Sequence, residues 1–358
     1  MKFAFLVHPR GLSDVFKKYP VLRFLPRSLI EFFLLKFWPP VFVAKITGLK
    51  SRGGGSIPIT GCVISVPLTA KQMMEYRSVA SKKILVAANF AKKLGAKIIG
   101  LGALTSSLSR GGLDLVDKVD VNITTGHAYT AYNVTKNIFE LCNIFGLDKK
   151  KITVAIVGAA GSIGSTSAQV LARAGYQNLL LIDLERKHRF FKKLERELKN
   201  LNTEINISFS HQIKDVIDAD IIITATNAPE AIVKADDLKA GAIIVDDAQP
   251  TDISEDVFDR EDVLVVSAGI VYTPNIEAHF DFGLAGKFDN FCCLAELLIL
   301  AAHEWDDHYV VERATLDSVD EIAEWGRDLG FQLAKFQNPR GLISAERFNE
   351  MKRIINQK

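Results

Sequence analysis

The sequence predicts an α/β fold in which a doubly wound parallel sheet is joined to a second α/β domain. From Ile152 to about Gly269, short apolar strands such as ITVAIVG, NLLLID and ADIIITATN alternate with helical segments. Strands that are apolar along their whole length are typical of parallel sheets covered by helices on both faces. The chain has 358 residues, which is enough for two domains of ordinary size.

The segments before this region predict further strands and helices from their periodicity and cap signals. TTGHAYTAY begins with a threonine cap signal, and the helix expected over 70–94 ends at Gly95, as helices often do. The expected strands are 2–7, 60–69 and 96–104; the expected helices are 70–94 and 124–146; the expected loop is SRGGGS at 51–56. We therefore assign residues 1–150 to the second domain, 151–285 to the doubly wound domain, and 286–358 to C-terminal helices that pack back on the second domain.

The composition limits the classes of function. Lys plus Arg number 44 and Asp plus Glu number 42, so no overall basic field favours nucleic acid. Four cysteines in a chain of this length form no disulfide framework and fit a reducing cytoplasm. No cysteine and histidine spacing typical of a metal site is present, and MKFAFLVHPRG is not a secretory signal. We expect a cytoplasmic protein without a metal.

The segment Val21–Gly48 is the most hydrophobic part of the chain. Glu31 and Lys36 interrupt it and Pro39 and Pro40 break it, so a membrane-spanning helix is not expected. Phe, Leu and Trp interspersed with basic residues suit a mostly helical segment that lies on a membrane or lines an apolar channel. A helix packed on the core is the alternative. The basic residues are Arg23, Arg27, Lys36 and Lys45.

A glycine-rich turn predicts a dinucleotide site of the Rossmann type. In VAIVGAAGSIGS, Gly158, Gly161 and Gly164 follow an apolar strand, and Ser162 and Ile163 open the next helix. Glycines allow a tight turn and close backbone approach, and the helix N-terminus offers amide groups and partial positive charge to a pyrophosphate. An ordinary strand–helix turn that binds nothing is the alternative.

The next two strands supply the other candidate contacts to the dinucleotide. Asp183 ends the second strand about 20 residues after the glycines, where a carboxylate binds the adenosine ribose and favours NAD. Arg186 and Lys187 follow at once and could hold the 2′-phosphate of NADP instead. Both NADH and NADPH therefore stay open. Thr224, Ala225 and Thr226 follow a later strand, in a loop that usually passes the cofactor.

Several motifs, taken in order along nearly the whole chain, resemble the long-chain acyl-[acyl-carrier-protein] reductases, which make fatty aldehydes. They are KKILVAANFAKKLGAKIIGLGALTSS, TTGHAYTAY, VAIVGAAGSIGS, ADIIITAT, IIVDDAQP, VVSAGIV and FCCLAE. The resemblance implies a reaction in which a cysteine of an FxCxAE motif takes the acyl group as a thioester. A nicotinamide hydride then reduces that thioester to the aldehyde.

In FCCLAE, the residue that matches the family's cysteine is Cys293, whereas Cys292 falls on a position that need not be cysteine. A small core residue is the alternative for Cys293. His127 and Tyr129 stand where family sequences have Asn and His, and they are the candidate polar helpers. His279 is a further candidate base. Lys83 matches a basic position of the family, although a solvated helix face is the commoner explanation. Glu296, one helical turn from Cys293, is either structural or orients a partner.

The resemblance also implies the substrates and partners. They are a long-chain acyl group carried by acyl carrier protein or coenzyme A, with peripheral contact to a membrane as a further expectation. The basic residues near Val21–Val43 could dock an acidic carrier protein. Two other functions stay open, a shikimate-dehydrogenase-like enzyme that oxidises a small hydroxy or amino acid, and a non-catalytic module that binds a dinucleotide and lipid.

Overall fold

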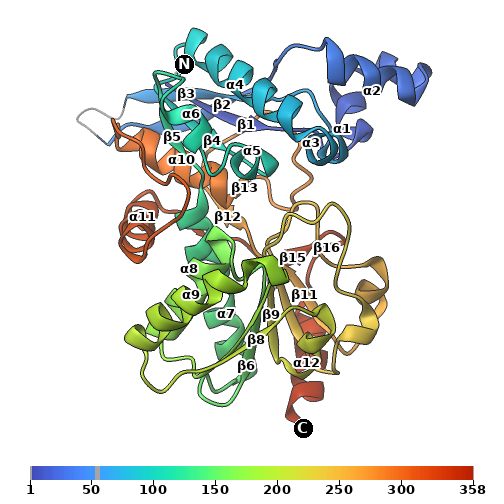
Figure 1. The fold of residues 1–358 in the computed structure, drawn as a ribbon, viewed down its shortest axis with the longest axis vertical. Helices are drawn as coiled ribbons and strands as arrows, with labels where there is room; N and C mark the ends of the chain where they lie inside the picture. The colour runs from blue at the N-terminus through green and yellow to red at the C-terminus, as the bar shows by residue number, and fades with distance from the viewer. Residues whose placement is uncertain (1, 53–56, 358) are drawn as a thin grey trace. The chain divides into compact units, whose positions relative to one another are not determined.

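The computed structural model describes residues 2–52 and 57–357 (Figure 1), so 53–56 of the expected loop lie outside the described residues. The chain divides into two compact units that interleave along the sequence. Unit 1 comprises Met1–His127, Thr273–Arg313 and Glu324–Phe331, and unit 2 comprises Ala128–Tyr272, Ala314–Ala323 and Gln332–Lys358. Each unit is an α/β layer structure with its own sheet, which confirms the predicted fold class.

Unit 1 is built on a mixed five-stranded sheet. Its strands are β1 (Phe3–Val7), β2 (Val41–Lys50), β3 (Pro58–Ser65), β4 (Ile98–Leu101) and β5 (Asn122–Thr124). The order is β2-β3-β1-β4-β5; β1 runs parallel to β3 and β4, β5 runs parallel to β4, and β2 is an antiparallel edge strand. The carboxyl ends of four strands therefore meet at one edge of this sheet.

Side chains alternate between the two faces of the unit 1 sheet, as the pleat of a strand requires. Ala4 and Leu6 face a core that includes the alanine-rich side of α4 (Arg77–Lys93). Phe3 and Phe5 lie on the other face, where a Cβ on Gly100 would contact both Phe5 and Leu297 of α10 (Cys292–Ala302). Helices α4 and α10 thus cover opposite faces.

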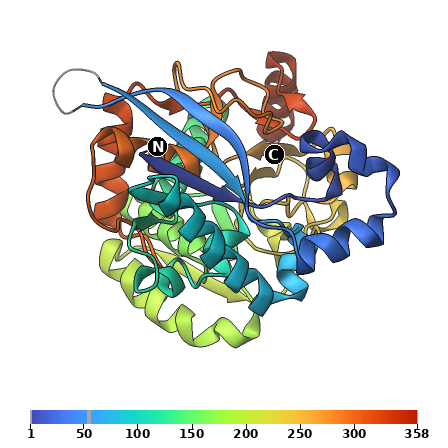
Figure 2. The same ribbon diagram turned by 90° about the horizontal axis from the view of Figure 1, so that it is seen from above.

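The remaining helices of unit 1 are short. They are α1 (Leu12–Lys18), η1 (Pro20–Phe24), α2 (Arg27–Lys36), α3 (Ala70–Glu75), α5 (Leu104–Ser107) and α6 (Leu113–Val116). Figures 1 and 2 both show α1 and α2 at the rim of unit 1, beyond the carboxyl end of β1. The single helix expected over 70–94 is two helices, because Tyr76 between them leaves the helical conformation with a φ of −114° and a ψ of 51°.

Unit 2 contains a six-stranded sheet in which all strands are parallel. The strands are β6 (Thr153–Val157), β7 (Asn178–Ile182), β8 (Asn206–Ser210), β9 (Ile221–Thr224), β10 (Ile243–Asp246) and β11 (Leu264–Ser267). Their order is β11-β10-β9-β6-β7-β8. Successive strands are added on one side of β6 up to β8 and on its other side from β9 onward, so the topological switch point lies between β6 and β9. Ligands of open α/β sheets bind beyond the carboxyl ends of the strands at this kind of switch point.

Helices and turns cover both faces of the unit 2 sheet. One face packs against α7 (His127–Phe145), α8 (Ser162–Arg173), α9 (His188–Leu201) and α12 (Ala345–Asn356). The other face packs against irregular segments and the short helices η3 (Ile213–Asp218), η4 (Ala235–Asp237) and η5 (Glu255–Asp259). The predicted helix over 124–146 begins later, at His127, because Asn122–Thr124 forms β5 and Gly126 turns the chain.

The other elements are η2 (Glu185–Lys187), β12 (Ile270–Tyr272), β13 (Asp289–Phe291), α11 (Leu316–Asp328), β14 (Gln332–Leu333), β15 (Gln337–Asn338) and β16 (Gly341–Leu342). Strand β12 pairs with β14, and β15 pairs with β16, both antiparallel. Among the described residues, no helix is long and apolar enough to cross a membrane.

Candidate active site

The glycine turn of unit 2 connects β6 to α8 and is too tight for larger residues. Gly158 has a φ of +88°, and a Cβ there would lie 2.5 Å from the carbonyl oxygen of Ala225. A Cβ on Gly164 would overlap the carbonyl oxygen of Gly158. Gly161 is the N-cap of α8. The turn thus has the backbone geometry that a phosphate-binding glycine pattern requires.

The first turn of α8 is held in place from the side. Ser162 Oγ accepts a hydrogen bond from the backbone N–H of Ala314 at 3.2 Å, and Ser165 Oγ donates to the carbonyl of Gly161 at 2.7 Å. Ile163 packs against the core of the unit. Because the N-cap is a glycine, no N-cap side chain covers the first amide groups of this helix. This end of α8 fits the pyrophosphate of a dinucleotide.

Asp183 joins the end of β7 to the glycine turn. Its Oδ2 accepts from the backbone N–H of Ala160 at 2.9 Å, and its Oδ1 accepts from the N–H of Leu184 at 2.8 Å. Arg186 follows in η2 with an exposed side chain, and His211 Nδ1 lies 2.8 Å from the carbonyl oxygen of Asp183. The carboxylate therefore holds the turn, and its contact with an adenosine ribose stays a prediction.

The loop after β9 contains the other predicted cofactor residues and is tied to buried carboxylates. Thr224 Oγ1 donates to Asp246 at 2.7 Å, and Thr226 Oγ1 donates to Asp252 at 2.6 Å. Ala225 meets the glycine turn through its carbonyl oxygen. Burial, opposed by the Thr226 hydrogen bond and assisted by the Asp246 charge, raises the pKa of Asp252 to about 7. Burial and the two neighbouring carboxylates also raise the pKa of Asp247.

These aspartates were not among the residues predicted from the sequence. The signal was the run DDAQPTD directly after the strand IIV, at the carboxyl edge of the sheet. Two adjacent carboxylates at the end of a buried parallel strand must lie close to the neighbouring strand ends. The structure accordingly places this acidic cluster beside the loop Thr224–Thr226.

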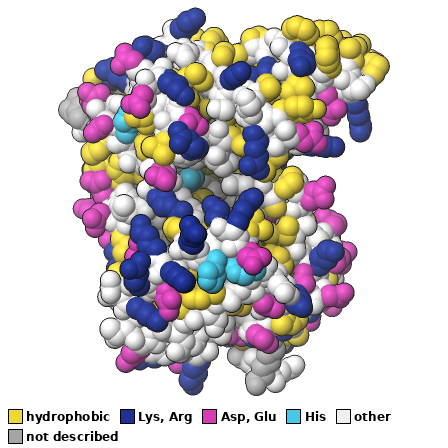
Figure 3. All heavy atoms as spheres, viewed as in Figure 1, with side chains coloured by type: hydrophobic (Ala, Val, Ile, Leu, Met, Phe, Trp, Pro, Cys, Tyr) yellow, Lys and Arg dark blue, Asp and Glu magenta, His cyan; other side chains and the backbone are white. Residues whose placement is uncertain are grey.

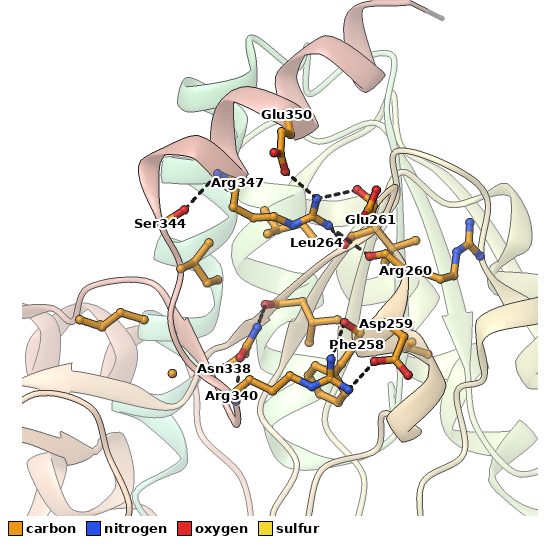
Figure 4. A pocket seen from close by; sticks show the side chains of 16 residues that line it. Phe258, Asp259, Arg260, Glu261, Leu264, Asn338, Arg340, Ser344, Arg347 and Glu350 are labelled. Atoms are coloured by element: carbon orange, nitrogen blue, oxygen red, sulfur yellow. Dashed lines mark hydrogen bonds and ion pairs between the residues drawn. The ribbon is translucent and has the colours of Figure 1, made fainter.

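A separate hollow in unit 2, of about 460 Å³, contains no predicted site residue (Figure 4). Arg347 donates to the carbonyl oxygens of Glu261 and Val263, the latter at 2.7 Å. Arg340 donates to the carbonyl of Phe258 at 2.9 Å and pairs with acidic residues of η5. These arginines attach the C-terminal segment to η5 and to the residues just before β11.

Cys293 is the second residue of α10 in unit 1, so it lies in the first turn of that helix. Its side chain is partly exposed, whereas Cys292 is 1% exposed and packs in the core. The positive end of the helix dipole favours a thiolate in this position. The two adjacent cysteines therefore have different environments, and Cys293 is the one that solvent reaches.

A glycine turn also lies against Cys293. Gly126, after β5, has a φ of +78°, and a Cβ there would overlap the Cα and Cβ of Cys293. One helical turn further along α10, the buried Glu296 accepts hydrogen bonds through Oε1 from Thr124 Oγ1 and from the backbone N–H of Gly126, the latter at 3.1 Å. Glu296 thus fixes the turn that contacts the cysteine.

His127 follows this turn and is held neutral. Burial, with a smaller contribution from the charge of Arg313, lowers the pKa of His127 to about 4. Its Nε2 lies 3.2 Å from Ser106 Oγ. Its Nδ1 is buried and has no hydrogen-bond partner among the described residues, and the same is true of Thr125 Oγ1. Buried polar atoms without partners are rare, so these two are candidates to meet a ligand.

The other candidate helpers lie elsewhere. Tyr129 is buried in the part of α7 that belongs to unit 2, where its ring packs 5.7 Å from that of Tyr132. His279 is exposed and lies 2.7 Å from Thr47 Oγ1. Lys83 is on α4, on the face of the sheet opposite α10, and donates to the carbonyl of Trp38 at 2.8 Å. Of these candidate helpers, the structure therefore brings His127 to the turn beside Cys293 and places Tyr129, His279 and Lys83 elsewhere.

Comparison with known proteins bears first on unit 2. Residues 140–268 match the family model described as Shikimate / quinate 5-dehydrogenase. This segment contains the glycine turn, Asp183 and the loop Thr224–Thr226. It is an NAD(P)-binding domain of the dehydrogenase and reductase superfamily.

Two curated proteins are similar to most of this chain. Aminotransferase PigE from Serratia sp. is 26% identical over 377 residues, covering 99% of this chain and 42% of PigE. Long-chain acyl-[acyl-carrier-protein] reductase from Synechococcus elongatus is 26% identical over 326 residues, covering 83% of this chain and 89% of that protein. This chain therefore spans less than half the length of PigE.

A solved structure, the NAD-dependent malic enzyme from Thermotoga maritima, is similar with a TM-score of 0.44 and 12% identity. The alignment covers 99% of this chain and 83% of the malic enzyme chain.

Proposed function

We propose that this protein reduces a long-chain acyl thioester to a fatty aldehyde, with Cys293 as the nucleophile. The observation that carries the proposal is the position of Cys293, partly exposed in the first turn of α10 against the Gly126 turn, beside a buried Cys292. Similarity to the long-chain acyl-[acyl-carrier-protein] reductase supports the same chemistry. The NAD(P)-binding domain supports reduction by a nicotinamide dinucleotide.

In the first step, Cys293 exchanges one thioester for another. Its thiolate attacks the acyl carbonyl carbon, the bond to the carrier sulfur breaks, and the carrier leaves as a thiolate that takes up a proton. The acyl group stays activated because the new bond is again a thioester. The carrier is acyl carrier protein or coenzyme A, both of which present a thiol.

In the second step, Cys293 is the leaving group. A nicotinamide dinucleotide, when bound, supplies the hydride that reduces the acyl carbon. The glycine turn and the N-terminus of α8 would hold its pyrophosphate, and Asp183 or Arg186 its adenosine ribose. Cys293 then departs from the reduced carbon with the electron pair of the C–S bond, which releases the aldehyde and restores the thiolate.

The polar groups beside the Gly126 turn have a role in orienting the acyl carbonyl. With a pKa of about 4, His127 is neutral at pH 7 and acts as a hydrogen-bonding group rather than a cation. If Ser106 Oγ donates to Nε2, the ring proton lies on Nδ1 and is available to the carbonyl oxygen. Thr125 Oγ1 supplies a second donor for the same oxygen.

Intact-mass spectrometry after mixing the protein with palmitoyl-CoA, without reduced cofactor, tests this function. We expect an adduct of one palmitoyl group, mapped to Cys293, that NADH or NADPH discharges as hexadecanal. Cys293→Ala should remove both adduct and aldehyde, whereas Cys292→Ala, the neighbouring control, should keep them. A wild-type protein that binds NADH or NADPH but forms no adduct, or forms it on Cys292, would contradict the proposal.

The match of residues 140–268 favours a second candidate, an NAD(P)-dependent dehydrogenase of a small hydroxy acid. Such an enzyme needs no covalent cysteine. Turnover of shikimate or quinate that survives in Cys293→Ala would identify it, and turnover of palmitoyl-CoA that is lost in the same variant would exclude it.

A further inference from the structure

The segment between β1 and β2 exposes an unusual amount of apolar surface. Among the described residues, eight of the fifteen large hydrophobic side chains that are exposed lie within 19–37. We call these eight the α2 face: Tyr19, Val21, Phe24, Leu25, Leu29, Phe32, Phe33 and Phe37. Figure 3 shows hydrophobic side chains gathered over α2, with Lys and Arg side chains among them. Single exposed apolar residues are normal on proteins, but a continuous patch marks an interaction surface.

The α2 face is strongly exposed, and three of its aromatic rings form a cluster. Phe24 is 81% exposed and Phe37 is 68% exposed. The rings of Phe32, Phe33 and Phe37 contact one another, with centroids 5.9–6.0 Å apart. Water therefore covers a cluster of aromatic rings that would be stabilised by transfer to an apolar phase.

This exposure does not reflect a missing core in the segment. Ile30 and Leu34 of α2 are buried against Val15 of α1, with Phe16 and Trp38 packed around them. Leu29 and Phe33 each precede one of these buried residues and form a second apolar stripe along α2. Phe37, the C-cap, extends this stripe. An ordinary surface helix would present polar residues there. The second stripe is therefore available to something outside this small core.

The charges around the α2 face are mostly positive. Arg23, Arg27 and Lys36 are exposed, and Glu31 is the single acidic residue within 15–38. Arg23 lies over the ring of Phe24, with 5.9 Å between its Cζ and the ring centroid. Basic side chains beside apolar rings are typical of segments that lie in the interface of a negatively charged bilayer.

We propose that the α2 face docks the protein on an anionic lipid bilayer, with its aromatic rings inserted below the headgroups and Arg23, Arg27 and Lys36 among the phosphates. An acidic carrier protein would be attracted by the same charges, but it would not require eight exposed apolar side chains. The bilayer satisfies both features, since it offers negative headgroups and hydrocarbon in one surface. The proposal rests on this surface alone and is independent of the proposed reduction.

Co-sedimentation of the full chain with vesicles tests the proposal. We expect binding to phosphatidylcholine vesicles that contain phosphatidylglycerol and several-fold weaker binding to phosphatidylcholine alone. Phe24→Ser with Phe37→Ser should lower the partition coefficient about tenfold or more. Arg23→Glu with Arg27→Glu should lower it by at least about fivefold for each charge and remove its sensitivity to salt. Val86→Ser with Leu342→Ser, which changes two other residues of about half exposure, is the control and should bind as the wild type does.

Other results would overturn the proposal. One is equal, weak association of the wild type with both kinds of vesicle. Another is a vesicle-independent dimer that Phe24→Ser with Phe37→Ser converts to monomer in sedimentation velocity, because a second copy would then cover the α2 face. A third is binding of acyl carrier protein that those serine substitutions abolish while vesicle binding is absent. Circular dichroism melting of every variant distinguishes loss of vesicle binding from loss of folding. Aldehyde formation from a water-soluble acyl-CoA distinguishes loss of vesicle binding from loss of the proposed reaction.

Discussion

Units 1 and 2 each have a tight glycine turn after a parallel strand, and the turn contacts different parts of the structure in the two units. In each, a glycine with positive φ follows a parallel strand, Gly126 at +78° and Gly158 at +88°. In each, a carboxylate from another element accepts an N–H of that turn, Glu296 in unit 1 and Asp183 in unit 2. The Gly158 turn leads directly into α8, whose N-cap Gly161 offers no side-chain cap. The Gly126 turn instead packs on the N-terminus of α10, which is distant in sequence and carries Cys293. A tight turn thus opens a helix in unit 2 and packs against the start of another helix in unit 1.

Adding one methyl group to either glycine turn should have the largest effects, and each substitution should impair the function of its own unit. Gly126→Ala and Gly158→Ala both introduce a Cβ in a left-handed conformation against backbone atoms, at a cost of roughly 1–3 kcal/mol each. We expect Gly126→Ala to lower the rate of palmitoyl adduct formation at Cys293 by about 100-fold or more while dinucleotide binding persists. Gly158→Ala should abolish dinucleotide binding while the adduct still forms.

Fluorescence quenching of NADH and intact-mass kinetics give the two measurements. Gly146→Ala serves as a control, because it also has a positive φ, of +67°, but no heavy atom lies within 4 Å of its added Cβ. Loss of both properties in both variants, at a temperature where each is folded, would show that the two turns do not act separately.

Acidification should have the next largest effect: it should lower the stability of unit 1 and raise the stability of unit 2. The folded pKa of His127, about 4, lies below its ordinary value of 6.5, so the unfolded chain binds this proton more readily. Its contribution to stability is complete above pH 6.5 and is lost as the pH falls towards 4, by roughly 3 kcal/mol at 1.36 kcal/mol per pH unit. Asp252 has a folded pKa of about 7 against 3.8, so the folded chain binds the proton and unit 2 gains stability as the pH falls from above 7.

The three tryptophans, Trp38, Trp305 and Trp325, all lie in unit 1, so tryptophan fluorescence during urea unfolding reports on that unit. Hydrogen exchange of peptides from β9 and β10 reports on unit 2. In His127→Gln, the stability of unit 1 should depend less on pH below pH 6.5. In Asp252→Asn, the stability of unit 2 should depend less on pH. An unchanged pH profile in His127→Gln would mean that this histidine is not the buried neutral group.

The smallest effect is expected from the carboxylate of the unit 2 turn. In Asp183→Asn, one oxygen that accepts an N–H becomes an NH₂ donor, which faces either Ala160 or Leu184 and removes a hydrogen bond worth about 1–2 kcal/mol. Affinity for NADH should fall about tenfold, while affinity for NADPH changes less because a negative charge beside the 2′-phosphate is also removed. Calorimetric titration with each dinucleotide measures this, and Arg186→Gln, with the opposite charge change, should weaken NADPH alone. Equal losses for both dinucleotides in Asp183→Asn would contradict the ribose contact.

The sequence allowed the fold class and the glycine turn to be predicted because both depend on short-range patterns. Apolar strands of five residues separated by helices specify a parallel sheet, and Gly158 and Gly164 stand at the spacing that a tight strand–helix turn needs. The break at Tyr76 was not predictable, since helical periodicity continues through it and only the local backbone angles interrupt it. The late start of α7 at His127 has the same cause, a turn at Gly126 whose need for glycine comes from Cys293, far away in sequence.

The cysteine site could be predicted only in part, because it depends on contacts between residues that are far apart in the sequence. The resemblance selects Cys293, and the structure adds that Cys292 is buried. Thr125 and Ser106 lie within motifs of that resemblance, TTGHAYTAY and GALTSS, but nothing in these motifs separates them from the polar residues beside them. Their relevance arises from burial without a partner or from contact with His127, both of which depend on tertiary packing. Likewise, the composition of Val21–Gly48 left a membrane surface, a channel and a packed helix as alternatives. The structure adds which stripe of α2 packs in the small core and which stripe stays exposed. The membrane contact inferred from the exposed stripe stays a proposal.

The interleaving of the two units has a consequence for biosynthesis. As the chain leaves the ribosome, β1 to β5 emerge first, but α10, which covers the Phe3 and Phe5 face of their sheet, is made only after the whole sheet of unit 2. The first sheet must therefore wait with one apolar face uncovered until Cys292–Ala302 arrives. Truncation before α10 should leave a nascent chain that depends on chaperones, and Cys293 is added only after the Gly126 turn that it contacts has been made.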